Sequence, residues 1–160
     1  MLFRSPQAIE NGAVAILSNG RSPKTKAVPI LQVKDPRLAM SQISAQFYGN
    51  PSAKINIVGI TGTNGKTSIT HILHHILQTS GAACGTLGTL GFQTPSGMVS
   101  TGFTTPESVE LQQMLQTLTL AGVDNLVMEI SSHALDLHRV DDVEVDIAVF
   151  SNLTPEHLDF

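Results

Sequence analysis

The chain has 160 residues, of which 41% are apolar and 14% are charged, and its formal net charge is −4 at pH 7. This apolar content allows a sizeable core and excludes a disordered chain, while the acidic balance argues against nucleic-acid binding through a basic surface. The single cysteine, Cys84, excludes an intramolecular disulfide, and with neither a secretory signal nor an apolar run of about 20 residues we expect a cytoplasmic protein without a membrane partner.

The first fifty residues predict a small α/β unit with two helices and two strands. Its second helix is the clearest element, because Asp35 offers a capping carboxylate directly before Pro36 at the first helical position. We expect three residues of this helix, Leu38, Ile43 and Phe47, to face inward. The four predicted elements are a helix at 6–11, a buried strand at 13–17, a strand at 28–33 and a helix at 36–47.

A break follows at residues 49–52, where Gly-Asn-Pro-Ser predicts a domain boundary between 1–50 and 51–160. Beyond it, apolar strands alternate with helices, which indicates an α/β fold with a mostly parallel sheet. We expect Thr105 to be the N-cap of the helix that follows it. The predicted elements are buried strands at 55–60, 125–130 and 146–150, helices at 66–78 and 106–121, and a short strand within the glycine-rich run 82–92.

The residues between the first strand and the first helix of this second part predict a phosphate-binding loop. Small residues at 62–65 let backbone N–H groups approach phosphate oxygens, and the helix N-terminus adds partial positive charge. Lys66 can reach the β- and γ-phosphates of a nucleotide, and the hydroxyl of Thr67 can bind Mg²⁺. The standard pattern has a glycine at the position of Ile60, whereas here the glycine is Gly59, so an ordinary glycine-rich turn is the alternative.

Four segments of the second part stand in a characteristic order. They are Gly-Ile-Thr-Gly-Thr-Asn-Gly-Lys-Thr at 59–67, Thr-Thr-Pro-Glu at 104–107, Met-Glu-Ile-Ser-Ser-His-Ala-Leu at 128–135 and Asn-Leu-Thr-Pro-Glu-His-Leu-Asp at 152–159. Together they resemble the Mur ligase family, and within it the UDP-N-acetylmuramoyl-tripeptide synthetases.

The resemblance implies a domain organisation as well as a fold. Residues 1–50 would be the C-terminal part of an N-terminal UDP-binding domain, and residues 51–160 the N-terminal part of a central ATP-binding domain with a P-loop-type sheet. The amino-acid-binding C-terminal domain of the family has no counterpart in these residues. We therefore expect a fragment that is inactive as a ligase on its own.

The resemblance also implies roles for individual residues. Those implied to bind ATP are Thr61, Gly62, Thr63, Asn64, Gly65, Lys66 and Thr67. Those implied to hold Mg²⁺ are Thr67, Glu129 and His157, and those implied to be catalytic are Lys66, Glu129 and His157. Those implied to contact the substrate are Thr104, Thr105, Ser131 and Arg139.

The residue types themselves support some of these roles and leave alternatives open. Glu129 ends a buried strand, where α/β proteins place ligand groups, and a buried carboxylate needs a partner such as Mg²⁺. Its alternative role is to cap a helix or to form ordinary hydrogen bonds. Arg139 can hold a carboxylate through two parallel hydrogen bonds. Thr104 and Thr105 precede a proline-started helix, so helix capping is the alternative for this pair.

The reaction that the resemblance implies is an ATP-dependent amide ligation in peptidoglycan biosynthesis, which supports cell shape and cell division. A carboxylate of UDP-N-acetylmuramoyl-L-alanyl-D-glutamate would be activated as an acyl phosphate, with ATP and Mg²⁺ as cofactors. The amine of L-lysine or meso-diaminopimelate would then form the amide, and the full-length enzyme would be monomeric. A folylpolyglutamate-type ligase and a nucleotide-binding module without catalysis are the alternatives.

Two further features of the second part are predicted to be structural. His71, His74 and His75 have a helical spacing that can bind a metal, but no glutamate follows His71 as in zinc proteases. We therefore expect them to form an exposed or partly packed helix face. Cys84 has no basic neighbour that would activate its thiol, which favours a structural role.

Overall fold

The structure, a computed structural model, describes residues 5–20 and 27–155 of the chain. Its elements in chain order are α1 (Ser5–Glu10), β1 (Ile16–Ser18), β2 (Ile30–Gln32), α2 (Pro36–Phe47), the 3₁₀ turn η1 (Pro51–Lys54), β3 (Asn56–Thr61), α3 (Lys66–Thr79), β4 (Cys84–Gly88), β5 (Gly91–Thr94), β6 (Gly97–Val99), α4 (Ser108–Leu120), β7 (Asn125–Glu129), α5 (Ser132–Asp136) and β8 (Ile147–Phe150).

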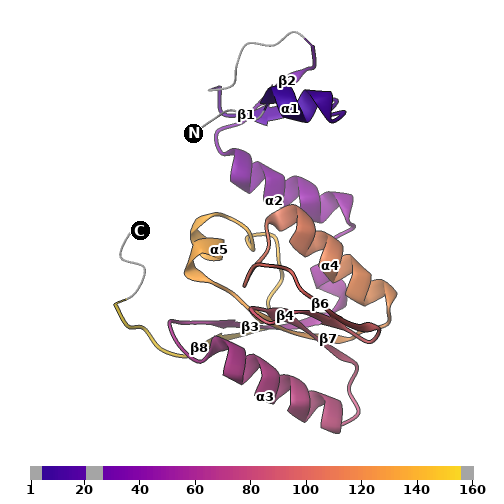
Figure 1. Cartoon of the computed structure of the whole chain (residues 1–160), viewed down its shortest axis with the longest axis vertical. Coiled ribbons are helices and arrows are strands. Elements are labelled where there is room, and N and C mark those ends of the chain that lie inside the picture. The colour runs from indigo at the N-terminus through magenta and orange to yellow at the C-terminus, as the bar shows by residue number, and fades with distance from the viewer. Residues whose placement is uncertain (1–4, 21–26, 156–160) are drawn as a thin grey trace.

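The centre of the molecule is a six-stranded sheet in the order β6-β5-β4-β7-β3-β8. Strands β4, β7, β3 and β8 run parallel to one another, while β5 and β6 extend the sheet in antiparallel fashion. Helix α3 covers one face of the sheet, and α4 and α5 lie over the other, with α2 beyond α4 (Figure 1). The α/β fold with a mostly parallel sheet, predicted from the sequence, is confirmed.

Apolar side chains cover both faces of the sheet. On the α4 side, Leu115 and Leu118 are buried against Ile57 of β3. On the α3 side, Ile60 is buried and Leu73 packs against it and its neighbours. A central parallel strand has no face toward solvent, which explains the near-continuous apolar run of β3. No helix in the described part of the chain has the length and apolarity needed to cross a membrane.

The first segment differs most from its sequence-based prediction. β1 and β2 form a separate parallel pair of three residues each, and both are shorter than predicted. The prediction of a buried strand at 13–17 is wrong, because Val14 lies outside β1 and is 83% exposed. Two side chains predicted to face inward from α2, Ile43 and Phe47, are 54% and 80% exposed.

Helix α2 itself has the predicted bounds and the predicted cap. The Asp35 carboxylate accepts hydrogen bonds from the backbone N–H groups of Arg37 and Leu38, at 2.8 and 3.1 Å. The buried side of α2 carries small residues, Ser44 and Ala45, because this side packs against α4. The inward face of α2 is therefore decided by what α4 can accommodate and not by the largest apolar side chains.

Two expectations for the second part also need correction, and the short strand predicted within 82–92 is confirmed as β4. Helix α4 begins at Ser108 with Glu107 at the N-cap position, so Thr105 is not its cap. β8 was predicted to be buried, but it is an edge strand that pairs only with β3, and its Ile147 and Phe150 are exposed. The glycine-rich run forms a fully buried strand, β4, and continues into the β5–β6 hairpin.

Candidate functional site

The predicted phosphate loop is the turn between β3 and α3. The structure places residues 61–67 together there, with Gly65 at the N-cap of α3 and Lys66 as its first residue. Gly62 and Gly65 have φ angles of 125° and 90°, which residues with side chains rarely adopt. A Cβ atom on Gly62 would also lie 2.8 Å from the carbonyl oxygen of Asn152. Glycine is thus required at this position, and the loop ends in the N–H groups of a helix N-terminus, which suit an anion.

The segment that follows β8 supports this loop from outside. The carbonyl oxygen of Asn152 accepts the N–H of Thr63 at 2.9 Å. The side-chain amide of Asn152 bonds to both backbone groups of Asn64, accepting at 3.0 Å and donating at 2.9 Å. The Ser151 hydroxyl donates to the Asn64 carbonyl at 2.7 Å, and the Thr154 N–H donates to the Thr63 hydroxyl at 2.9 Å. The loop conformation is therefore held by the protein itself.

The side chain of Lys66 lies over its own loop. Its ammonium group donates to the carbonyl oxygens of Gly62 and Thr63, at 2.6 and 3.0 Å. An ammonium group has three N–H donors, so one remains for a further acceptor. Lys66 lines three hollows, and its charge can serve a group in any of them.

Glu129 is the last residue of β7 and pairs across the sheet with Ile60 of β3. Its side chain is only 1% exposed. Oxygen Oε2 accepts the hydroxyls of Thr67 and Thr89, at 2.9 and 3.2 Å, and Oε1 accepts the N–H of Thr89 at 2.9 Å. All three partners are donors, an arrangement that suits an ionised carboxylate because this form only accepts hydrogen bonds.

The oxygen atoms around Glu129 fit a magnesium ion. Mg²⁺ prefers hard oxygen ligands such as carboxylates and the hydroxyl of a phosphate loop. The Thr67 hydroxyl donates a hydrogen bond to Glu129, so the lone pairs of its oxygen stay available to a metal. Both residues, with Lys66 and Thr104, line a hollow of about 350 Å³. The third predicted ligand, His157, lies outside the described residues.

The four predicted substrate residues come together at a neighbouring hollow of about 300 Å³, which also contains Lys66. They reach it from two regions of the chain, the segment before α4 and the segment around α5. These residues are Thr104, Thr105, Ser131 and Arg139. Because Lys66 and Thr104 line both hollows, the predicted substrate site and the predicted nucleotide site are continuous.

Two of these four residues already have structural roles. Thr105 is buried, and its hydroxyl donates to the Glu129 carbonyl at 3.0 Å while accepting the N–H of Ser131 at 3.1 Å. Ser131 caps α5, because its hydroxyl oxygen accepts the N–H of Ala134 at 3.2 Å. Thr105 therefore links the end of β7 to the segment before α4, and Ser131 fixes the start of α5.

Arg139 is engaged by groups of the protein. Its guanidinium forms an ion pair with Glu107 at 2.8 Å and donates to the Thr105 carbonyl at 3.0 Å. The other carboxylate oxygen of Glu107 accepts Arg37 of α2, also at 2.8 Å. Glu107 thus lies between two guanidinium groups and joins the first segment to the central sheet. A two-bond grip of Arg139 on a substrate carboxylate would have to replace Glu107.

The helical histidines do not form a metal cluster, and no group of three or more His, Cys, Asp or Glu side chains within 5–20 and 27–155 could hold a metal. His74 is buried and its Nε2 lies 3.2 Å from the carbonyl oxygen of Cys84. Burial lowers the pKa of His74, mainly because the charged imidazolium loses hydration. Cys84 is buried as well, and desolvation raises the pKa of its thiol to about 11. Both residues are packed into the α3–β4 contact.

Sequence reasoning missed three polar residues at this site. Thr89, which bonds twice to Glu129, lay in a glycine-rich run without a recognised motif. Its signal was a polar residue directly after a buried strand, where α/β proteins place ligand groups. Ser151 and Asn152 follow β8 in the same way. Asn152 belonged to a segment used for the family resemblance, but no role was predicted for it.

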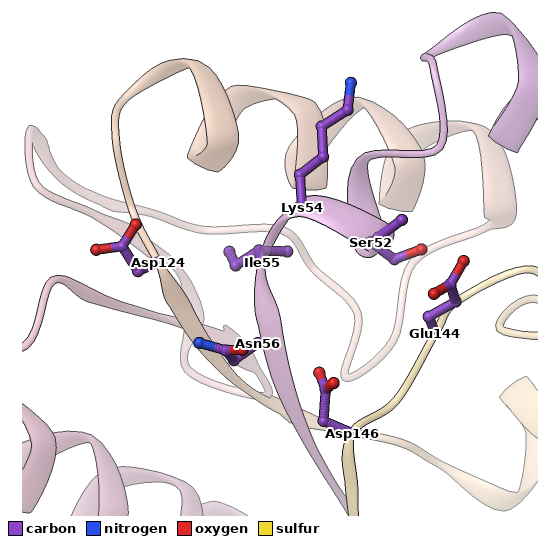
Figure 2. A pocket seen from close by; sticks show the side chains of 8 residues that line it. Ser52, Lys54, Ile55, Asn56, Asp124, Glu144 and Asp146 are labelled. Atoms are coloured by element: carbon purple, nitrogen blue, oxygen red, sulfur yellow. The ribbon is translucent and has the colours of Figure 1, made fainter.

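A separate hollow lies at the opposite, amino end of the sheet, with a volume of about 440 Å³. Figure 2 shows its side chains, among them Lys54 from η1, Asp124 from the turn before β7, and Glu144 and Asp146 from the segment before β8. The carboxylate of Asp146 accepts the N–H of Ile57 at 2.7 Å. It thereby satisfies a backbone group at the start of the sheet, which is a structural role.

Comparison with known proteins finds similarity to bacterial ligases. A family model described as the Mur ligase middle domain matches residues 60–160. The UDP-N-acetylmuramoyl-L-alanyl-D-glutamate--2,6-diaminopimelate ligase of Caldanaerobacter subterraneus is 45% identical over 154 residues, which are 96% of this chain and 32% of that protein. The ligase of the same name from Listeria monocytogenes is 40% identical over 154 residues, 96% of this chain and 31% of that protein. The chain thus spans about a third of the length of the curated relatives it matches.

Solved structures agree with this assignment. A structure of a UDP-N-acetylmuramoyl-L-alanyl-D-glutamate--2,6-diaminopimelate ligase matches with a TM-score of 0.81 and 28% identity. The match covers 96% of this chain and 31% of the chain in that structure. The MurF ligase of Thermotoga maritima, solved in complex with ADP, has a TM-score of 0.59 at 20% identity, covering 97% of this chain and 32% of its own. The second likeness shows the fold alone.

Proposed function

The chain belongs to the Mur ligase family, and from this premise we propose that it supplies part of the nucleotide and peptide sites of an ATP-dependent ligase of peptidoglycan precursor synthesis. One observation carries the proposal. A phosphate loop that is held in shape by the protein brings Lys66 and the hydroxyl of Thr67 beside the buried carboxylate of Glu129. A charged lysine, a hydroxyl and a carboxylate at the start of a helix are the groups that bind a magnesium nucleotide.

Each residue of the site has a defined task in this proposal. Backbone N–H groups at 62–67 bind the phosphates, and Lys66 turns from its own loop carbonyls toward the β- and γ-phosphates. Thr67 and Glu129 hold Mg²⁺, and His157 is proposed as a further ligand. Magnesium, when bound, neutralises charge on the transferring phosphoryl group. The residues themselves contribute mainly position and fixed charge, which provide most of the catalysis in phosphoryl transfer.

The substrates follow from the names of the relatives. We take the acceptor to be UDP-N-acetylmuramoyl-L-alanyl-D-glutamate, whose carboxylate attacks the γ-phosphorus of ATP to give an acyl phosphate and ADP. The amine of 2,6-diaminopimelate then attacks the acyl carbon, phosphate leaves, and an amide forms. Thr104, Thr105, Ser131 and Arg139 would contact the acceptor, and L-lysine is the competing amine. Both substrates are water-soluble, which supports a cytoplasmic reaction.

The domain organisation belongs to the same proposal. Residues 1–50 would end a UDP-binding domain and residues 51–160 would begin the ATP-binding domain. The separate β1–β2 pair and the break at Asn50, whose φ angle is 48°, support a division at this point. Within the described residues, the Arg37–Glu107 ion pair connects the two parts across this boundary.

Titration calorimetry of the chain with Mg-ATP tests the nucleotide site. We expect saturable binding that Lys66→Ala weakens by about tenfold to a hundredfold, because a charged hydrogen bond contributes about 1.5–3 kcal/mol. Lys54→Ala, which removes a lysine at the amino end of the sheet, is the matched control and should leave the affinity unchanged. Absence of binding by the unaltered chain, or equal losses in both variants, would contradict the proposal.

The reaction itself can be tested in a chimera. This chain would replace the segment of the Caldanaerobacter ligase that it matches, with 45% identity over 154 residues. We expect the purified chimera to form the amide product with 2,6-diaminopimelate, as detected by mass spectrometry, and Lys66→Ala in the chimera to abolish it. A folded chimera that binds Mg-ATP but forms no product would refute the ligase assignment for this segment.

A further inference from the structure

Thr89 is the only described residue that bonds to both carboxylate oxygens of Glu129. We propose that Thr89 is a positioning residue for Glu129, which fixes the carboxylate for a metal-bound nucleotide and connects it to Thr104 of the substrate hollow. This inference rests on the proposed function and adds a residue to which none of the sequence motifs points.

The geometry of the two bonds leaves the carboxylate one orientation. The Thr89 N–H donates to Oε1 at 2.9 Å, and its hydroxyl donates to Oε2 at 3.2 Å. Both donors come from the turn between β4 and β5, while Glu129 ends β7, the strand that pairs with β4. Thr67, the third donor, comes from α3 and shares Oε2 with Thr89. Rotating the carboxylate would break at least one bond to Thr89.

The residue before Thr89 shows how closely this turn approaches the carboxylate. A Cβ atom on Gly88 would lie 2.7 Å from both Cγ and Cδ of Glu129, and closer still to Oε1. Glycine is required here because a side chain would collide with Glu129. The backbone itself makes no such demand, because the φ angle of Gly88 lies outside the left-handed region. The chain at Gly88 and Thr89 therefore packs directly on the carboxylate.

The hydroxyl of Thr89 also determines the direction of its hydrogen bond with the Thr104 hydroxyl. A hydroxyl has one proton, and that of Thr89 is used toward Glu129. The 3.1 Å hydrogen bond between Thr89 and Thr104 must then be donated by Thr104. With its proton engaged, Thr104 offers only lone pairs to the hollow. A ligand atom that meets the Thr104 hydroxyl must therefore be a donor, such as a peptide N–H, and not a carboxylate oxygen.

The first test uses the chain without any ligand. A backbone N–H that donates to a carboxylate resonates downfield and exchanges slowly, so we expect both properties for the Thr89 amide proton in an NMR spectrum. Glu129→Gln replaces the charged acceptor by a neutral one, and the Thr89 amide proton should move upfield while remote amides stay in place. A Thr89 resonance that does not respond to this change would overturn the proposal.

The second test measures metal-dependent binding. Thr89→Val removes the hydroxyl at nearly constant volume, and Thr89→Ser retains it. We expect Thr89→Val to weaken binding of Mg-ATP by about tenfold, as for the loss of one hydrogen bond to a charged group, and to change binding of ATP in EDTA by less than about twofold. Thr89→Ser should restore the affinity for Mg-ATP. Thr117→Val, an identical change on the exposed side of α4, is the control for the substitution itself.

Three outcomes of the second test would count against the role of Thr89. They are unchanged affinity in Thr89→Val, no rescue by Thr89→Ser, and an equal loss with and without the metal, which would indicate a purely structural role. Thermal unfolding of each variant identifies losses caused by misfolding. An unaltered chain that binds no Mg-ATP would overturn the proposed function and this inference together, whereas a failure confined to the Thr89 variants would overturn only the inference.

Discussion

The two ends of the central sheet both carry carboxylates around a hollow, but they differ in how far these carboxylates are buried and in what they bond to. At the carboxyl end, Glu129 is 1% exposed and its oxygens accept three hydrogen bonds from the protein. At the amino end, Asp124, Glu144 and Asp146 all lie exposed to solvent, and Asp146 completes the hydrogen bonding of the sheet. The amino-end hollow measures about 440 Å³, while the 350 Å³ hollow beside Glu129 adjoins the substrate hollow of about 300 Å³.

The contrast teaches that the hydrogen bonding of the carboxylates, and not their number, distinguishes the two ends of this sheet. Burial of a carboxylate costs several kcal/mol unless its hydrogen bonds are made, so the fold must supply dedicated partners for Glu129. Exposed carboxylates are hydrated by water and need no such partners. A buried carboxylate with dedicated hydrogen-bond partners beside a phosphate loop therefore marks the site. Three variant pairs and one pH profile test this comparison.

The largest difference is expected between Glu129→Gln and Asp146→Asn. Glutamine at 129 would direct an NH₂ group at hydroxyl or N–H donors, and these donors would lose their acceptor. We therefore expect the affinity for Mg-ATP to fall by about 10- to 100-fold. The free energy of unfolding should fall by about 1–3 kcal/mol. Asparagine at 146 can still accept the N–H of Ile57, and Mg-ATP affinity should stay within about twofold. Calorimetry and urea denaturation measure the two effects, and similar affinity losses at both positions would remove the distinction.

A second pair compares the carboxyl end with the middle of the sheet. Gly88→Ala places a methyl group against the Glu129 carboxylate and should lower the free energy of unfolding by about 1–3 kcal/mol. Gly59→Ala in β3 meets the ends of the Ile130 and Val145 side chains, at 2.7 and 3.1 Å, and these can shift. We expect a smaller loss at 59 than at 88 in urea denaturation. The reverse order would show that Glu129 is not tightly enclosed.

A third pair tests the support of the phosphate loop. Asn152→Ala removes the two bonds to Asn64 and should weaken Mg-ATP binding by about fivefold, as expected for about 1 kcal/mol. Asn56→Ala at the amino end removes a side-chain bond to Asn125 at 3.2 Å and should leave nucleotide affinity unchanged. Calorimetry decides between the two, and a full-affinity Asn152→Ala variant would show that the loop keeps its shape without this residue.

The smallest effect is expected from His138, the residue before Arg139. Its Nδ1 lies 2.6 Å from Asp141 and its Nε2 lies 3.7 Å from Asp35, the cap of α2. The hydrogen bond to Asp141 raises the pKa of His138 above its usual 6.5. The charged form is thus favoured by folding, and its contribution is complete below the unfolded pKa and lost as pH rises through the folded one.

The unfolding midpoint should therefore fall slightly as the pH rises above 6.5, the usual pKa of histidine. His138→Asn is a suitable control, because asparagine tolerates the positive φ angle of 54° at this position and carries no titratable charge. Differential scanning calorimetry of both proteins measures the difference between their pH profiles. Parallel profiles would show that the charged form of His138, bonded to Asp141, does not contribute to stability.

Local chemistry in the sequence was sufficient for the elements whose ends it determines. The capping carboxylate of Asp35 before Pro36 predicted the bounds of α2, and the glycines at 62 and 65 predicted a loop that only glycine allows. Packing between elements was not accessible in this way. Ile43 and Phe47 fit an inward face by periodicity, but the close approach of α4 selects the small side of α2.

The same limit applies to the candidate site. The residues of the phosphate loop are neighbours in sequence, so their proximity was predictable from the motif. Thr89 and Glu129 are 40 residues apart and meet only because β4 pairs with β7 in a register that aligns their ends. Thr105 was a plausible helix cap by position, yet the β7 end draws its hydroxyl to the Glu129 carbonyl. Contacts of this kind depend on strand order, which periodicity does not encode.

Because Cys84 is buried, the reactivity of its thiol can be used to measure local unfolding of the sheet. This thiol lies in β4, between the α3 helix and the strand β7, and a pKa of about 11 leaves almost no reactive thiolate at neutral pH. A maleimide or disulfide reagent can therefore label it only after β4 has opened. The labelling rate of this single position follows the opening of the sheet where β4 pairs with Asn125 of β7, and no engineered cysteine is needed.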